Sequence, residues 1–163
     1  MESTLRYCKA AYRVVGRQVI CPISSEAEST AIKKAFSDLK TFQFNGARGH
    51  LLSAASHLSA GHFADSVRDS IHAVEAVATA IEPSANVLSK ALQKLEQKTL
   101  IHPAMRKGFD ALYAYTSDEG GIRHALLEPS ANVDETDAVF MLGSCAAFVS
   151  HLVNKARLAG LLK

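Results

Sequence analysis

The sequence predicts an all-α protein, a helical bundle preceded by a short N-terminal β-hairpin. Three observations support this class: apolar residues recur at helical spacing over residues 63–81, another apolar stripe follows residue 134, and the β-branched segment YRVVGRQVICPI occupies residues 12–23. A chain of 163 residues can bury about two-thirds of its unfolded surface as one domain. We therefore assign residues 1–23 to the hairpin and residues 24–163 to a single helical domain.

The first helix of this domain is expected to begin just after Ser24 or Ser25, because a serine side chain caps a helix N-terminus well. Glu26 and Glu28 then fall in the first turn, where the helix dipole favours negative charge. We place the end of this helix at about Leu39.

Two further helices are predicted on either side of Gly61. Asn45-Gly46 indicates a turn, so the second helix is expected over residues 47–60, with one apolar face formed by Leu51, Ala54, Ala55 and Leu58. The third helix, residues 63–81, is strongly periodic, and its apolar stripe comprises Phe63, Val67, Ile71, Val74, Val77 or Ala78, and Ile81.

The rest of the chain predicts three more helices. The EPSANV segment interrupts the chain, a fourth helix follows over residues 87–97, and His102-Pro103 opens a fifth. Asp134 and Asp137 resemble a capping pair for a long last helix, which we extend to about Lys163. The apolar face of this last helix is wide enough to be buried between two neighbours or against another subunit.

Composition and charge limit the classes of partner. The net charge of +2 is too small to indicate nucleic acid or membrane by itself. Residues 83–109 carry five basic side chains and one acidic, a net of +4, whereas residues 110–137 carry seven acidic and one basic, a net of −6. No apolar stretch approaches the roughly 18 residues of a membrane span. We therefore expect a cytoplasmic protein with no membrane partner.

Seven histidines raise the question of a metal site. No HExxH or His-x3-His pattern lies on a predicted helix. His57 and His62 stand on either side of the break at Gly61, so we expect them not to share a face. Neither a metal nor a cofactor is predicted, and the glycine-rich phosphate-binding motifs and the GxSxG motif do not occur.

The segment YTSDEGGIRHALLEPS, residues 115–130, is the part that reads least like ordinary helical packing. A guanidinium can stabilise charge on a phosphate and an imidazole can move a proton near pH 7, the two roles that metal-free RNA cleavage requires. We take the adjacent Arg123 and His124 as candidate catalytic residues, converging most readily across the two-fold axis of a dimer. Supporting residues are expected nearby at Ser117, Asp118 and Glu128.

The third helix carries a polar stripe formed by Arg68, His72 and Glu75 at spacing i, i+4, i+7. Glu75 lies near the core edge and needs a cation or donors, which Arg123 can supply at two points. The alternative to catalysis is therefore a structural Arg123–Glu75 pair; in the catalytic interpretation, His72 and Glu75 are supporting residues. The fourth helix presents a lysine stripe that either aids solubility or contacts RNA: Lys90, Lys94 and Lys98.

Several long stretches resemble the HEPN superfamily, and most closely the HEPN-type domains of abortive-infection (AbiJ-like) bacterial proteins. They are FNGARGHLLSAASHLSAGHFADSVRDSIHAVEAVATAI, LSKALQKLEQKTLIHPAMRKGFDALYAYTSDEGGIRHALLE and DAVFMLGSCAAFVSHLVNKA. The resemblance covers about residues 24–155, and YTSDEGGIRHA with SIHAVEAV is its most specific part. It implies a helical bundle that forms a homodimer and acts as a metal-independent endoribonuclease in phage defence or toxin–antitoxin systems. RNA and an antitoxin or other protein are the implied partners.

The active motif of that family is an arginine, usually followed by a polar residue, with a histidine after four to six intervening residues. Arg123 matches the arginine and His124 the polar second position. The positions at which the motif's histidine should fall hold Glu128, Pro129 and Ser130. Either His124 has taken over proton transfer, or this domain is a non-catalytic module for dimerisation or interaction.

Overall fold

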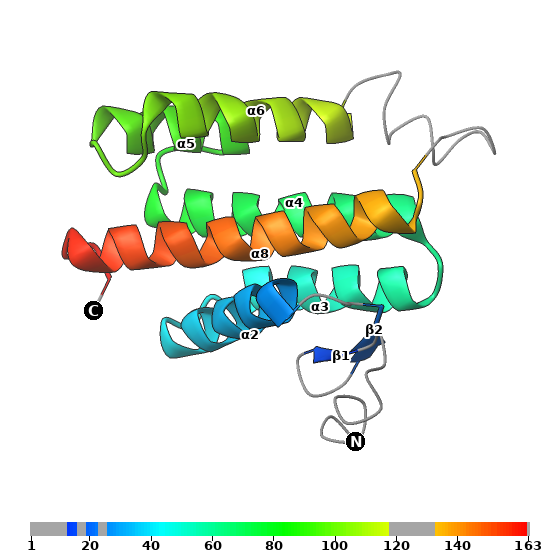
Figure 1. Ribbon diagram of the computed structural model, residues 1–163. Coiled ribbons are helices and arrows are strands. Elements are labelled where there is room, and N and C mark those ends of the chain that lie inside the picture. Colours follow the sequence, from blue (N-terminus) through cyan, green and yellow to red (C-terminus); the bar gives the residue numbers. More distant parts are fainter. Residues whose placement is uncertain (1–12, 16–18, 23–25, 118–132, 163) are drawn as a thin grey trace.

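The computed structural model shows an all-α bundle with a two-stranded antiparallel hairpin at its N-terminal side, as predicted (Figure 1). It describes residues 13–15, 19–22, 26–117 and 133–162. The described elements are β1 (Arg13–Val15), β2 (Val19–Cys21), α2 (Glu26–Thr41), α3 (Asn45–Ser59), α4 (Phe63–Ile81), α5 (Leu88–Gln97), α6 (Pro103–Ser117) and α8 (Glu135–Leu158).

The hairpin packs on α3 rather than standing apart from the helices. Val14 pairs with Ile20 in the antiparallel register, and β2 lies against α3. The Cys21 thiol donates a hydrogen bond to the Ala55 carbonyl oxygen at 3.2 Å, and the Ser59 hydroxyl donates to the Ile20 carbonyl oxygen at 2.6 Å. The hairpin is therefore attached to the bundle through both apolar burial and hydrogen bonds.

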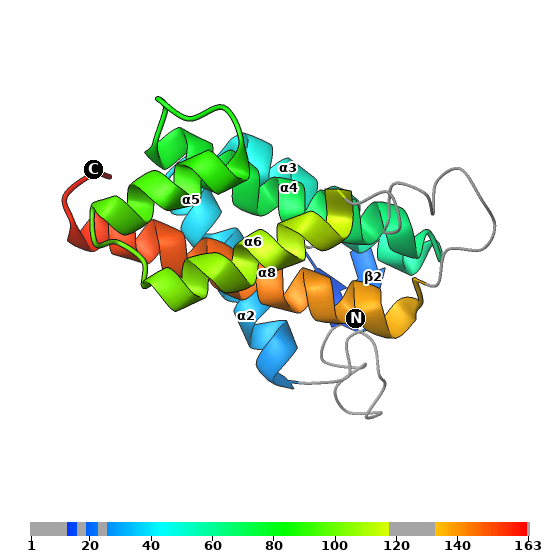
Figure 2. The same cartoon turned by 90° about the horizontal axis from the view of Figure 1, so that it is seen from above.

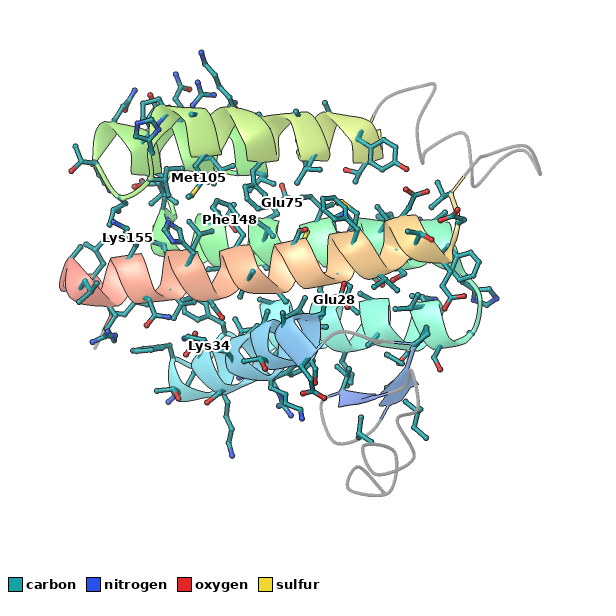
Figure 3. All side chains as sticks on the ribbon, in the orientation of Figure 1. Glu28, Lys34, Glu75, Met105, Phe148 and Lys155 are labelled. Atoms are coloured by element: carbon teal, nitrogen blue, oxygen red, sulfur yellow. The ribbon has the colours of Figure 1, made fainter. Side chains whose placement is uncertain are left out.

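The helices lie in three layers, with α5 and α6 on one side, α4 and α8 in the middle, and α2 and α3 on the other side (Figures 1 and 2). α8 contacts α2, α3 and α4. Phe148 of α8 also stacks on Phe109 of α6, in the space between α8 and the α5–α6 layer (Figure 3). The predicted wide apolar face of α8 is thus buried within this chain, at Leu142, Cys145, Ala146, Val149, Leu152 and Val153.

Two predicted boundaries were wrong. Asn45-Gly46 is not a turn but the first two residues of α3; the chain reverses just before it, where Gln43 adopts a positive φ of 59°. The last helix ends at Leu158 and not near Lys163, because Gly160 adopts a φ of 72°. The Leu161 amide then donates to the Ala156 carbonyl oxygen at 2.9 Å, which closes the helix end.

Other local signals are confirmed. Residues Phe63–Ile81 form one helix, with the bounds that the periodicity predicts, and Gly61 before it has a φ of 78°. Asp134 and Asp137 form a reciprocal capping box, each side chain accepting a hydrogen bond from the other residue's backbone amide.

The expectation that no apolar stretch approaches the length of a membrane span was wrong, because α8 is such a stretch. Among the described helices, it alone contains an 18-residue window apolar enough by length and composition, with a mean hydropathy of 1.5. Of that window, 56% is buried inside the bundle. The apolar composition of α8 is therefore explained by its central position, and the fold is compatible with a soluble protein.

Candidate functional site

The predicted catalytic segment falls largely outside the described residues. Asp118, Arg123, His124 and Glu128 all lie there, and Ser117 is the last residue of α6. The helices on either side of the segment are described: α6 ends and α8 begins at the same end of the bundle, where α3 turns into α4 (Figures 1 and 2). The catalytic roles of Arg123 and His124 remain predictions.

Glu75 has a partner that the sequence did not indicate. Its Oε1 accepts a hydrogen bond from the backbone amide of Leu88, the first residue of α5, at 3.0 Å. The Val87 side chain makes no capping hydrogen bond, so Glu75 caps α5 from the neighbouring helix α4. Figure 3 shows Glu75 between α4 and the α5–α6 layer. Glu75 thus has a hydrogen-bond donor among the described residues, whether or not Arg123 also binds it.

Two lysines of the predicted basic stripe have contacts within the chain. Lys94 Nζ donates to the Ser84 carbonyl oxygen at 3.1 Å and to the Ser84 hydroxyl at 2.8 Å. Lys98 pairs with Glu82, and hydrogen bonds from Lys98 and Ser84 hold the pKa of the Glu82 carboxyl below its ordinary value. Lys90 is exposed. Lys94 and Lys98 therefore fasten α5 to the α4–α5 connection, and their contact with RNA stays a prediction.

A cluster of histidines around Asp69 lies between α3 and α4, and the sequence did not predict it. His50 Nδ1 lies 3.3 Å from Asp69 Oδ1, and His72 Nδ1 lies 3.9 Å from the same oxygen. His57 Nε2 lies 3.5 Å from the other carboxylate oxygen, Oδ2. The His50 and His72 rings meet edge to face, with centroids 5.4 Å apart. One carboxylate is therefore shared by three imidazoles from two helices.

His57 and His62 are also close in space, contrary to the expectation that they would not share a face. Their ring centroids are 5.9 Å apart, because the positive φ of Gly61 lets the chain reverse tightly between α3 and α4. Both histidines lie near the Asp65 carboxylate. Arg68, one member of the predicted polar stripe, turns to Asp65 and donates a hydrogen bond at 2.6 Å.

The electrostatics of the cluster favour a neutral imidazole at His72. Partial burial lowers the pKa of His72, the nearby His50 lowers it further, and the carboxylates of Glu75 and Asp69 act in the opposite direction. The Asp69 side chain is only 15% exposed, whereas those of His50 and His72 are 41% and 40% exposed. The cluster therefore offers imidazole nitrogens and a shielded carboxylate at a surface that solvent can reach.

The sequence did contain a signal for this cluster. His50 and His72 each stand eleven residues from Gly61, on opposite sides. In an antiparallel helical hairpin, residues equally distant from the turn lie side by side. A search for histidine spacing along one helix cannot find a site whose ligands come from two helices.

Two surface cavities flank the C-terminal half of α8. One, of about 430 Å³, lies against α2 and is lined by Lys34, Asn154 and Leu158 among others; the other, of about 550 Å³, lies beside the α5–α6 connection. His151 and Lys155 line both. The His151 Nε2 atom is buried and has no hydrogen-bond partner among the described residues, and burial lowers the pKa of this imidazole. The structure describes the side chains of two residues of the predicted catalytic segment, Tyr115 and Thr116, and they line neither cavity.

The fold and these sites define an all-α bundle with a histidine-rich helical hairpin. Comparison with models of known protein families, with curated proteins and with solved structures gives no match. The functional assignment therefore depends on the residues themselves and on the resemblance noted in the sequence.

Proposed function

We propose that this chain is a HEPN-like domain of a bacterial defence system, cytoplasmic and dimeric, that cleaves RNA without a metal ion. The observation that carries the proposal is the similarity of YTSDEGGIRHA and SIHAVEAV to the HEPN-type domains of abortive-infection (AbiJ-like) bacterial proteins. The all-α bundle supports it, because this is the architecture that the resemblance implies.

The division of roles follows from the chemistry of the side chains. Arg123 stabilises the negative charge that develops on the phosphate, and His124 moves the proton of the 2′-OH nucleophile. Attack by the 2′-oxygen forms a bond to phosphorus while the bond to the 5′-oxygen breaks, which leaves a 2′,3′-cyclic phosphate, and the 5′-oxygen takes up the proton that the imidazole had accepted. Adjacent residues do not reach one atom easily from a single helix, so a second copy of the chain completes each site.

The competing proposal is a non-catalytic module for dimerisation or interaction with another protein, such as an antitoxin. One observation favours it: Glu128, Pro129 and Ser130 occupy the positions at which the motif's histidine should fall. In this case Arg123 serves as a structural partner of Glu75 and takes no part in chemistry.

Cleavage of RNA in the presence of EDTA separates the two proposals. Wild-type protein is incubated with mixed RNA beside Arg123→Ala, His124→Ala and the control His102→Ala, which changes an exposed histidine before α6. Loss of a general acid–base group costs about 10²–10⁴-fold in rate, and loss of a group that stabilises the developing charge costs about 10²–10³-fold. We therefore expect cleavage by wild type and control, and losses of these orders in His124→Ala and Arg123→Ala. Equal cleavage by all four proteins, or none by wild type, contradicts the catalytic proposal.

A further inference from the structure

The atoms of the α3–α4 cluster are arranged as the ligands of a metal ion are. One ligand atom each from His50, Asp69 and His72 lies within 4.8 Å of the other two. His50 belongs to α3, and Asp69 and His72 belong to α4 at spacing i, i+3, so both helices contribute. The three side chains therefore converge on one point between the two helices.

The separations fit metal coordination, and the contact between His50 and Asp69 is at the same time a long hydrogen bond. Two ligands that each lie about 2.0–2.1 Å from a tetrahedral zinc ion are about 3.3 Å apart. Asp69 Oδ1 lies 3.3 Å from His50 Nδ1 and 3.9 Å from His72 Nδ1. A well-formed N–H···O hydrogen bond has a donor–acceptor distance of about 2.9–3.0 Å. The cluster thus requires only small side-chain movements to accept an ion.

The donor types determine the class of ion. Two imidazole nitrogens and one carboxylate oxygen suit zinc and its neighbours cobalt and nickel, whereas calcium and magnesium prefer oxygen ligands throughout. We propose that His50, Asp69 and His72 bind one divalent transition-metal ion of the zinc class, with a water molecule in the fourth position. This site shares His72 with the residues expected to support RNA cleavage, but the proposed cleavage itself requires no metal.

The second histidine group is less suited to this role. It consists of His57, His62 and Asp65, but Arg68 already donates a hydrogen bond to Asp65, and its positive charge opposes a cation there. His57 instead supports the first group, because its Nε2 lies 3.5 Å from Asp69 Oδ2, whereas His50 contacts Oδ1. An imidazole in that position orients the carboxylate ligand.

Metal titration of the untagged chain tests the site. Protein treated with chelator and then freed of it is titrated with ZnCl₂, CoCl₂ and MgCl₂ by calorimetry, and the visible absorption of Co²⁺ reports its geometry. The ligand variants are His50→Ala, His72→Ala and the isosteric Asp69→Asn. His57→Ala removes the supporting imidazole, and His102→Ala is the matched control outside the cluster. Circular dichroism and the Tm without metal establish that each variant is folded.

We expect wild type and His102→Ala to bind one Zn²⁺ or Co²⁺ per chain, with a tetrahedral Co²⁺ spectrum, and to bind Mg²⁺ far more weakly. Loss of a group that only supports a ligand costs about 10–100-fold in affinity, the range expected for His57→Ala. The three ligand variants should lose more than about 100-fold, and their Tm should no longer rise with Zn²⁺. The proposal is wrong if wild type shows no saturable binding of one ion, or if Asp69→Asn and His50→Ala bind as tightly as wild type.

The two proposals fail separately. RNA cleavage is measured in EDTA, so absence of metal binding does not affect it, and metal binding is measured without RNA. An active RNase that binds no Zn²⁺ contradicts only the metal site.

Discussion

Replacing Glu75 by alanine is expected to destabilise the protein by about 1–2 kcal/mol. The Glu75 carboxylate accepts the Leu88 amide hydrogen at 3.0 Å, and the Val87 side chain offers α5 no cap of its own. A side-chain cap contributes about 0.5–2 kcal/mol, and a negative charge at a helix N-terminus adds about 0.3–1 kcal/mol. α5 has only 10 residues, so an uncapped first turn affects much of the helix.

Two further substitutions separate the contribution of the Glu75 hydrogen bond to stability from the contribution of its charge. Glu75→Gln retains an acceptor for the Leu88 amide and removes only the charge, so its cost should be about 0.3–1 kcal/mol. Glu135→Ala is the matched control, because Glu135 likewise places a carboxylate at a helix N-terminus, but there Asp134 already provides the cap. The loss of stability in Glu135→Ala should therefore also be only about 0.3–1 kcal/mol, the contribution of the charge.

Urea unfolding followed by far-ultraviolet circular dichroism measures these differences at pH 7. If Glu75→Ala unfolds at the same urea concentration as wild type, the hydrogen bond to Leu88 does not stabilise α5 and the reasoning is refuted. Arg123→Ala in the same assay examines the structural alternative. A buried pair broken on one side loses roughly 3–5 kcal/mol, whereas a surface arginine without such a role changes stability by less than about 0.5 kcal/mol.

Further predictions concern the backbone and the thiols. Gly61→Ala should cost about 1–2 kcal/mol, because the φ of 78° is unfavourable for residues with a Cβ, whereas Gly108→Ala, inside α6 with open space around the added Cβ, should stabilise by about 0.5–1 kcal/mol. Thermal unfolding measures both variants, and a Tm that is higher for Gly61→Ala than for Gly108→Ala would contradict this prediction. Burial raises the pKa of Cys21 and Cys145 to about 12, so iodoacetamide at pH 8 should alkylate neither thiol before denaturation, as peptide mass spectrometry can verify.

The sequence predicted those helices whose signals are local. α4 has one face toward the core along its whole length, so its periodicity gave both ends correctly. The start of α3 was missed because the residue in the left-handed conformation at the end of α2 is Gln43 and not a glycine or asparagine. The Phe44 amide donates to the Leu39 carbonyl oxygen at 2.9 Å and completes the closure of α2 there.

The candidate sites were less predictable because their partners are distant in the sequence or belong to the backbone. The need of Glu75 for a donor was correctly anticipated, but a backbone amide such as that of Leu88 has no signature in residue identity. The convergence of His50 and His72 on Asp69 requires the register of two packed helices, which depends on the turn at Gly61. Once the hairpin geometry is known, the same residues indicate the cluster directly.

The central position of α8 has a consequence for how the chain folds as it is synthesised. α2, α3 and α4 all contact α8, yet α8 follows every one of them in the chain. Ribosomes release protein from the N-terminus onward, so the apolar faces that these three helices turn toward α8 stay uncovered until α8 has emerged. Completion of the core is therefore a late event, and a nascent chain that stops before residue 135 exposes the surfaces that chaperones bind.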